Sequence, residues 1–411
     1  MAAETASINK EYTFDKINDL PNSINQKWLT QRRIAVSILF FVNGFGFANL
    51  PTRLPELQQY YGVSNTQLGL ILLCSSFGAL AAMLLSSRVM LRFGSRQVAA
   101  VTAIGFAAVP PFLTFIPYLS VLLPLFFIMG AAIGSLEVAM NAQAIEVERL
   151  YKRPLMSSFH AVFSIGGGIG AAFGTAMTWG NVSVFIHFLV VAIISVGLLI
   201  WSAFHLLPQK TASESIEKQE DTQTTKSLKA QRLAILPIAL LAFCSMASEG
   251  TLTNWAAIFC THQYQATASQ SAFAFTVFLI AMTIVRLLGD KLTEFLGRYK
   301  LLLTSVLVSL LGVFIVFIAN NITIATAGMG FIGLGLATMV PLAYSAAGNT
   351  EGVPSAIAIP MISIFGYASF FIMPPFVGFM SDVFGLGVFV GVLGVLSVVM
   401  LVLVTTVLRR V

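Results

Sequence analysis

The sequence predicts an all-α membrane protein in which twelve transmembrane helices form two bundles of six. Hydrophobic residues make up 57% of the 411 residues and charged residues only 10%, whereas soluble domains carry about 25% charge because their surfaces are wet. A spanning helix uses about 20 apolar residues, so twelve helices need roughly 240 positions, which the hydrophobic content supplies. This composition excludes a soluble enzyme, a nucleic-acid-binding protein and a secreted disulfide scaffold.

Twelve apolar segments follow one another along the chain, each long enough to cross a bilayer. They are expected at about 34–52, 67–87, 97–117, 120–145, 156–178, 182–206, 234–260, 268–289, 300–319, 322–346, 354–379 and 384–408. The strands of outer-membrane barrels would instead alternate polar and apolar residues. The polar residues before the first segment lack the basic start, apolar run and cleavage site of a secretory signal. We therefore expect a cytoplasmic tail over 1–33.

The lysines and arginines predict the orientation. All but Arg53 of the 23 basic residues fall in the tail, in or beside alternate loops, in a central polar segment or at the C-terminus. Because cytoplasmic segments are enriched in Lys and Arg, both termini are expected in the cytoplasm and the protein in the cell (inner) membrane. This topology explains the net charge of +6, so the expected surroundings are a lipid bilayer and no nucleic-acid partner is expected.

A polar segment divides the hydrophobic region into two nearly equal parts. The predicted units are the tail 1–33, an N-terminal six-helix bundle over 34–206, a cytoplasmic linker over 207–233, a C-terminal six-helix bundle over 234–408 and a cytoplasmic C-terminus over 409–411. A shift of 203 residues aligns Gly94 with Gly297 and Gln67 with Gln270, which indicates a duplication. Because six is an even number, both halves share one orientation, as parallel repeats do.

Five segments carry a resemblance to a known family. They are RLPELQQYYGVSNTQLGL (53–70), LEVAMNAQAIEVE (136–148), MSSFHAVFSIGGGIGA (156–171), SEGTLTNWAAIF (248–259) and RLLGDKLTEFLGR (286–298). They resemble transporters of the major facilitator superfamily, and more narrowly its MosC-like branch. LEVAMN is also similar to the LETAAN segment of fucose-permease-type sugar–proton symporters. The resemblance implies two six-helix bundles around one central cavity at mid-membrane. This chain differs from those symporters at the outer end of the first segment, where they carry an aspartate and this chain has Asn49 and no acid.

The loop between the second and third segments carries a superfamily signature, Gly-x-x-x-Asp-Arg-x-Gly-Arg-Arg/Lys, in the form SRVMLRFGSR. Arg92, Gly94 and Arg96 match this signature, whereas Leu91 stands in place of the aspartate. In the second half of the chain, Glu294 stands at the acid position. The resemblance implies that these residues lock the inner ends of the bundles, and the missing aspartate predicts a weaker lock in the first half.

Two glutamates lie within apolar segments, where a charge costs roughly 2.5–3.5 kcal/mol at the centre of a helix. Such residues normally face a cavity, pair with another group or stay protonated. In the sugar–proton symporters the matching glutamate is a proton site, so Glu137 is predicted to couple protons, and Glu249 to share coupling or bind substrate. Asn141 lies four residues after Glu137 on the same helical face and is predicted to bind substrate. An internal contact between helices is the alternative for these residues.

Other polar and aromatic residues of the apolar segments are further candidates for substrate binding. They are Asn43, Thr253, Asn254, Trp255, His160 and Tyr367. Gly250 permits a local break in the seventh segment, and interrupted helices commonly line transporter sites. Trp255 offers a flat apolar face with an N–H, and packing is its equal alternative. His160 can relay protons near neutral pH or act as a structural hydrogen-bonding group.

Charged residues near the ends of the segments are candidates for gating. Arg286 and Asp290 lie four residues apart at the inner end of the eighth segment, where they form either a gate latch or a snorkelling arginine with a helix salt bridge. Arg53 is predicted to pair with Glu56. The glycines and prolines of the tenth and eleventh segments, Pro341 among them, are hinge candidates.

These patterns predict a proton-coupled symporter that moves a small polar metabolite by alternating access. Only the family resemblance favours a sugar, polyol, amino-sugar or similar ring. Proton-driven efflux of amphipathic compounds, which needs a mostly apolar cavity, is one alternative. Another is a non-transporting receptor or scaffold that docks through the central polar segment, and a third is an intramembrane enzyme. No metal or other cofactor is expected, because Cys74, Cys244 and Cys260 lack ligand spacing, and the protein is expected to be a monomer that is not an enzyme.

Overall fold

The computed structural model describes residues 22–115, 118–151, 155–207, 228–348, 350, 353 and 355–406. The helices are α2 (Asn22–Asn49), η2 (Pro51–Arg53), α3 (Leu54–Tyr61), α4 (Asn65–Phe93), α5 (Ser95–Ala108), η3 (Pro110–Thr114), α6 (Leu119–Tyr151), α7 (Met156–Trp179), α8 (Val184–His205), α9 (Leu228–Gln263), α10 (Ala268–Leu296), α11 (Arg298–Ile318), α12 (Ile322–Leu336), α13 (Met339–Gly348), α14 (Ser355–Phe384) and α15 (Val388–Thr406). Within these described residues, twelve helical stretches are long and apolar enough to cross a membrane, in agreement with the predicted number.

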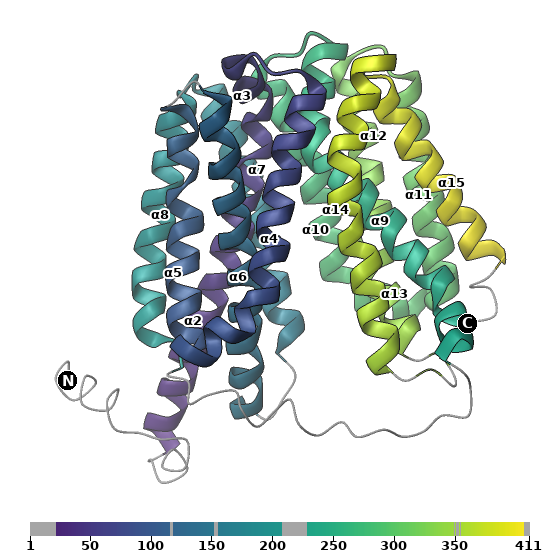
Figure 1. Cartoon of the computed structure of the whole chain (residues 1–411). Helices are drawn as coiled ribbons and strands as arrows, with labels where there is room; N and C mark the ends of the chain where they lie inside the picture. Colours follow the sequence, from purple (N-terminus) through teal and green to yellow (C-terminus); the bar gives the residue numbers. More distant parts are fainter. Residues whose placement is uncertain are drawn as a thin grey trace.

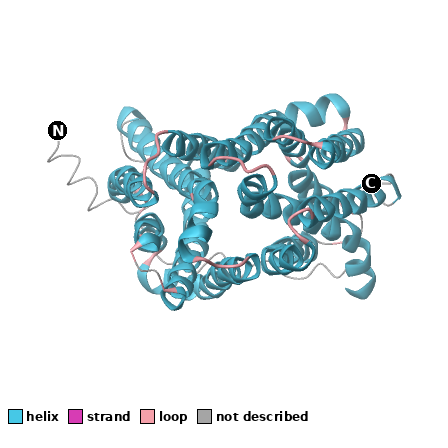
Figure 2. Cartoon of the chain, turned by 90° about the horizontal axis from the view of Figure 1, so that it is seen from above, coloured by secondary structure: helices cyan, strands magenta, loops and turns pink. Residues whose placement is uncertain are grey.

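The helices form two bundles, one from α2 to α8 and the other from α9 to α15 (Figure 1). Figure 2 looks down the helices, which run roughly parallel to one another. In the N-terminal bundle α4 packs on α6 and α2 on α7, and in the C-terminal bundle α14 packs on α9 and α11 on α12. The two bundles contact each other mainly through α4 with α14 and α7 with α10. These four helices therefore border the interface where a central site would lie.

Several boundaries differ from the expected ones. Helix α2 begins at Asn22, inside the segment expected to be tail, and α9 begins at Leu228, inside the expected linker. Hydropathy marks only the part of a helix that lies in hydrocarbon, whereas polar turns can extend the same helix into water. The remaining parts of the predicted tail (1–21) and linker (208–227, the docking segment of the scaffold alternative) lie outside the described residues, as do the predicted C-terminus (409–411) and the last two residues of the predicted C-terminal bundle (407–408).

The local break that Gly250 permits is absent, because α9 runs without interruption through this residue. A side chain there would approach the ring of Phe370 within 3.3 Å, so the glycine allows a neighbouring aromatic ring to pack closely. An interruption does occur in the tenth span, since α12 ends at Leu336 and α13 begins at Met339. Pro341 lies in the first turn of α13, where a helix tolerates proline, and its role as a hinge stays a prediction.

The duplication is visible in matched helix ends. Helices α4 and α10 are both 29 residues long, and each begins with a capping box, formed by Ser64 with Gln67 and by Thr267 with Gln270. Both helices end at a glycine with positive φ, 82° at Gly94 and 76° at Gly297, a conformation that side chains disfavour. The shift of 203 residues therefore aligns structural features of the two halves as well as residues.

The two ends of the molecule differ in charge and in how the bundles meet. We call the end that carries Arg32, Arg92, Arg96, Arg149 and Arg298 the basic end, which is the lower end in Figure 1. The other end is called the opposite end. Toward the opposite end, hydrogen bonds or ring contacts join the bundles at Thr66 with Asp382, Ser76 with Phe370, Thr175 with Thr276 and Trp179 with Phe273. The ribbons of the bundles diverge toward the basic end (Figure 1).

Candidate substrate and proton site

Glu137 connects the two bundles. It lies on α6, and its Oε1 accepts a hydrogen bond of 2.9 Å from the hydroxyl of Tyr367 on α14. The two residues are 230 positions apart in the chain, and each is half-buried. A tyrosine hydroxyl can donate to a carboxylate or accept from a protonated carboxyl. The contact is therefore able to persist in both protonation states of the glutamate, with the direction of the hydrogen bond reversed.

Asn141 lies one turn along α6 from this contact, as its spacing predicted. Its side-chain amide donates a hydrogen bond of 2.8 Å to the backbone oxygen of Glu137, and the residue is half-buried. This bond fixes the side chain on the same face as the glutamate. It uses one of the four hydrogen bonds that an amide side chain can make, so the geometry leaves capacity for a ligand.

Glu249 has a different partner. Its carboxylate on α9 forms an ion pair of 2.8 Å with the guanidinium of Arg286 on α10, and each side chain is 25% exposed. A salt bridge between Arg286 and Asp290 was one of two predictions for this pair, and it stays a prediction because the side chain of Asp290 lies outside the described residues. The contact between α9 and α10 joins two charges that would each be costly in the bundle alone. Glu137, by contrast, is bonded to a neutral hydroxyl.

His160 is exposed on α7, and its ring meets that of Phe40 edge-on at 5.3 Å. One turn farther along α7, the backbone oxygen of Ser164 accepts a hydrogen bond of 3.3 Å from Thr283 on α10. Thr283 lies about one turn from Arg286, so His160 and Arg286 occupy corresponding levels on two helices that touch across the interface between the bundles.

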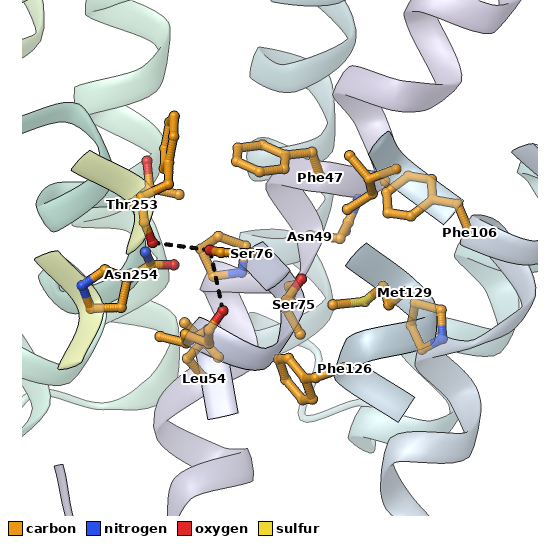
Figure 3. A pocket seen from close by; sticks show the side chains of 18 of the residues that line it. Phe47, Asn49, Leu54, Ser75, Ser76, Phe106, Phe126, Met129, Thr253 and Asn254 are labelled. Atoms are coloured by element: carbon orange, nitrogen blue, oxygen red, sulfur yellow. Dashed lines mark hydrogen bonds between the residues drawn. The ribbon is translucent and has the colours of Figure 1, made fainter. Parts of the chain in front are cut away.

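A cavity lies nearer the opposite end, between α2, α4, α5, α6, α8, α9 and α14 (Figure 3). Its polar lining comes from Asn49, Ser75, Ser76, Thr253 and Asn254, and much of the rest is aromatic, from Phe47, Phe106, Phe126, Phe188 and Phe370. In Figure 3 the side chains of Thr253 and Asn254 lie on one side and those of Phe106 and Met129 on the other. None of the described residues that line the cavity carries a charge.

The polar wall of the cavity is held in place by neighbouring backbone. The Ser76 hydroxyl donates a hydrogen bond of 3.0 Å to the oxygen of Phe370, which joins α4 to α14 across the bundles. The Thr253 hydroxyl donates to the oxygen of Glu249 at 2.8 Å. Ser75, Ser76 and Phe370 were not among the predicted substrate ligands. The available signal was the adjacent pair Ser75 and Ser76 in the apolar middle of α4.

A buried network next to Asn49 contains Arg53, the basic residue that the sequence places apart from the others. Arg53 is 1% exposed, pairs with Glu56 at 2.8 Å as predicted, and donates to Nδ1 of His187 at 2.8 Å. Because Nδ1 accepts, the proton of the neutral ring is on Nε2, which donates to Oδ1 of Asn49 at 2.7 Å. The arginine also donates to the oxygen of Val182. It is therefore satisfied internally and stabilises the wall of the cavity.

Two further predicted ligands are buried by packing. The amide of Asn43 contacts the sulfur of Met140 at 3.7 Å, which joins α2 to α6. Trp255 is fully buried, and its ring lies against Gly378 of α14. In this conformation Trp255 is therefore a packing residue, which was the alternative to substrate binding. A substrate contact at either residue stays a prediction.

The predicted gating residues lie at the basic end. Arg92 stacks over the ring of Phe93, with 5.3 Å between the guanidinium carbon and the ring centroid. Arg96 donates to the oxygen of Ala203 on α8 at 2.9 Å, within its own bundle. Gly94 provides the sharp turn into α5, and Glu294 is exposed. The lock that the family resemblance implies between these residues stays a prediction.

Comparison with known proteins identifies the family. Residues 36–247 and 238–411 match the family model described as Major Facilitator Superfamily. An uncharacterised MFS-type transporter of Yersinia pestis is 29% identical over 365 residues, which cover 89% of this chain and 93% of that protein. Membrane protein MosC of Rhizobium meliloti is 26% identical over 356 residues, which cover 86% of this chain and 84% of MosC.

Solved structures share the fold at lower identity. A mutant of the nucleoside transporter NupG aligns with a TM-score of 0.70 at 12% identity, covering 93% of this chain and 99% of that one. The E. coli fucose:proton symporter FucP aligns with a TM-score of 0.60 at 18% identity, covering 92% and 98%. The match to the family model extends over both bundles. This chain belongs to the major facilitator superfamily of transporters.

Proposed function

We propose that this transporter moves a small polar metabolite with a ring, such as a sugar, polyol or amino-sugar, in symport with protons, and that Glu137 is the coupling carboxyl. The observation that supports this proposal most directly is the 2.9 Å hydrogen bond between Glu137 and Tyr367 across the two bundles. By the positive-inside rule, the basic end and both termini lie in the cytoplasm. The transporter works as a monomer in the cell (inner) membrane.

The position of this bond supports proton coupling. Glu137 and Tyr367 belong to different bundles, so a rocking motion that separates α6 from α14 breaks their contact. A bare carboxylate in a low-dielectric environment is costly, and it then needs a proton or a substrate group as its new partner. The protonation state of Glu137 is thereby linked to which end of the transporter is open, as symport requires.

The cavity lining supports the substrate class. Side chains of Asn254, Thr253 and Ser75 supply amide and hydroxyl groups that exchange hydrogen bonds with the hydroxyls of a sugar or polyol. The aromatic side chains opposite them offer flat apolar surfaces against which the C–H face of a ring packs. Because no described lining residue is charged, an anionic metabolite would find no counter-charge. NupG and FucP, named as transporters of nucleosides and fucose, are consistent with a polar ring.

The test is uptake of a panel of radiolabelled sugars, polyols, amino-sugars and nucleosides into proteoliposomes with an imposed pH gradient. We expect Glu137→Gln to abolish accumulation driven by the gradient while keeping counterflow exchange of the same substrate, because exchange needs no net proton movement. Glu146→Gln on the same helix is the matched control, since Glu146 forms only a surface pair with Arg149. Gradient-driven accumulation by Glu137→Gln at the wild-type level would refute the coupling proposal.

A second candidate function is the proton-driven efflux of amphipathic compounds. The aromatic part of the cavity wall favours it, since Phe106, Phe126 and Phe188 would suit an apolar cargo as well as a sugar face. The two functions differ in their need for Asn141. Transport of a polar ring should be lost in Asn141→Ala, whereas export of an amphipathic dye should survive that change.

A further inference from the structure

The contact between α4 and α14 at the opposite end points to a gating residue outside the site described above. We propose that Asp382, at the last turn of α14, is a latch that holds the opposite end closed by capping the first turn of α4 in the other bundle. Its Oδ1 accepts from the backbone N–H of Asn65 at 3.1 Å, and its Oδ2 accepts from that of Thr66 at 2.8 Å. One carboxylate thus binds two consecutive amides.

The first turn of α4 needs this carboxylate. The first four N–H groups of any helix have no partner within the helix, and they form a positively polarised end that favours an anion. The α4 capping box satisfies two of them, because the N–H of Ser64 donates to the Gln67 side chain and the Ser64 hydroxyl accepts from the N–H of Gln67. Asp382 supplies the acceptors for the two between them, those of Asn65 and Thr66. The cap of α4 is therefore complete only while the two bundles touch.

Below the latch, backbone contacts continue down the same two helices toward the cavity. A Cβ on Gly378 would lie 2.4 Å from the oxygen of Asn65, and a Cβ on Gly69 would lie 2.5 Å from the oxygen of Pro374. Real side-chain carbons do not approach an oxygen so closely, so both glycines are required for this closure. We call the contacts from Asp382 down to Ser76 the α4–α14 seam.

The two ends of the transporter are therefore locked by different means. At the basic end, the signature loop has Leu91 where the family pattern places an aspartate, so the N-terminal bundle offers no carboxylate at that position. At the opposite end, a carboxylate is present and bonded to a helix N-terminus. This asymmetry biases the resting equilibrium toward the conformation in which the opposite end is closed. The inference needs only alternating access between two conformations and is independent of substrate and of Glu137.

The experiment measures opening directly in the purified full-length transporter in lipid nanodiscs. Spin labels at Tyr118→Cys and Asn320→Cys report the separation of the bundles at the opposite end, because these exposed residues precede α6 and α12. The three native cysteines are replaced in this background. Double electron–electron resonance then gives the populations of short and long distances without substrate or pH gradient.

We expect Asp382→Ala to raise the ratio of long to short distances about fivefold, which corresponds to the ~1 kcal/mol that an N-cap contributes. Asp382→Asn, which keeps one oxygen but loses the charge, should give a smaller rise in the same direction. Gly69→Ala should favour the long distance more strongly, because closure would force its methyl group onto Pro374. Unchanged distance populations in Asp382→Ala and Asp382→Asn would overturn the latch.

Two matched controls separate the latch from general damage. Thr267→Ala removes the equivalent cap of α10, which is formed within one bundle and has no part in the contact between the bundles. Gly391→Ala adds a methyl group to a helix where no atom lies within 4 Å. Both should leave the distance populations at wild type. A shift in Thr267→Ala as large as that in Asp382→Ala would mean that any loss of a cap opens the transporter, which would also overturn the proposal.

Discussion

Tyr367→Phe removes a single hydroxyl from the interface between the bundles and leaves the ring in place. The lost hydrogen bond is 2.9 Å long and ends on the carboxyl of Glu137. Hydrogen bonds to charged groups contribute about 1.5–3 kcal/mol. Because both residues are half-buried, we take the lower end of this range, ~1.5 kcal/mol, which is roughly a tenfold change in an equilibrium constant. The change should destabilise the conformation described here relative to its alternate by that factor.

The assay compares gradient-driven uptake with counterflow in proteoliposomes. We expect proton-driven uptake by Tyr367→Phe to fall about tenfold, while counterflow falls less because it does not require the coupling carboxyl to change its protonation state. Tyr344→Phe is the matched control, since the Tyr344 hydroxyl contacts Ser363 at 3.0 Å within the C-terminal bundle. Equal uptake by Tyr367→Phe and wild type, or an equal loss in both variants, would refute the coupling role of this bond.

Two further predictions concern stability and are read from thermal unfolding of the purified protein. Glu249→Gln should lower the free energy of unfolding by ~2 kcal/mol, because it leaves Arg286 without its counter-charge. The loss should be smaller than the 3–5 kcal/mol of a fully buried pair, since the Arg286 side chain is 25% exposed. Removing both charges should restore part of the loss, and an unchanged melting temperature in Glu249→Gln would contradict this. Gly44→Ala should lower the free energy of unfolding by more than ~2 kcal/mol, because the methyl group would lie 2.1 Å from the oxygen of Phe163. Gly197→Ala should be neutral or slightly stabilising, because its methyl group would meet no atom within 4 Å. Equal melting temperatures for these two variants would disprove the packing argument.

The sequence predicted correctly those features whose physical cause lies within a short stretch of the chain. Hydropathy over about 20 residues depends only on neighbours in the chain, so the twelve spans were predicted and are present. The matched residues of α4 and α10, Gln67 with Gln270 and Gly94 with Gly297, were also found, because they recur at one fixed spacing in the sequence. Arg53 was paired correctly with Glu56, three positions away. Helix ends were less accurate, since polar turns continue a helix beyond the hydrocarbon.

The candidate site was predictable as a set of residues but not as an arrangement. Glu137 and Glu249 stood out because charge is scarce in apolar segments. Their partners could not be found in this way, because Arg286 is 37 residues from Glu249 and Tyr367 is 230 residues from Glu137. The possible pairing of Arg286 with Asp290 came from helical spacing alone. The local break that Gly250 permits is absent from α9, and the ring of Phe370, far away in the sequence, packs against this glycine.

By itself, the sequence determined that this chain lives in a membrane, crosses it twelve times and is built from two similar halves. These properties follow from the cost of placing polar groups in hydrocarbon, which each segment meets on its own. The tertiary structure decided which carboxylate is bonded to a hydroxyl and which to a guanidinium, where the uncharged cavity lies, and that Asp382 meets the first turn of α4. Those contacts join residues from different helices and depend on how whole bundles pack, which no local pattern encodes.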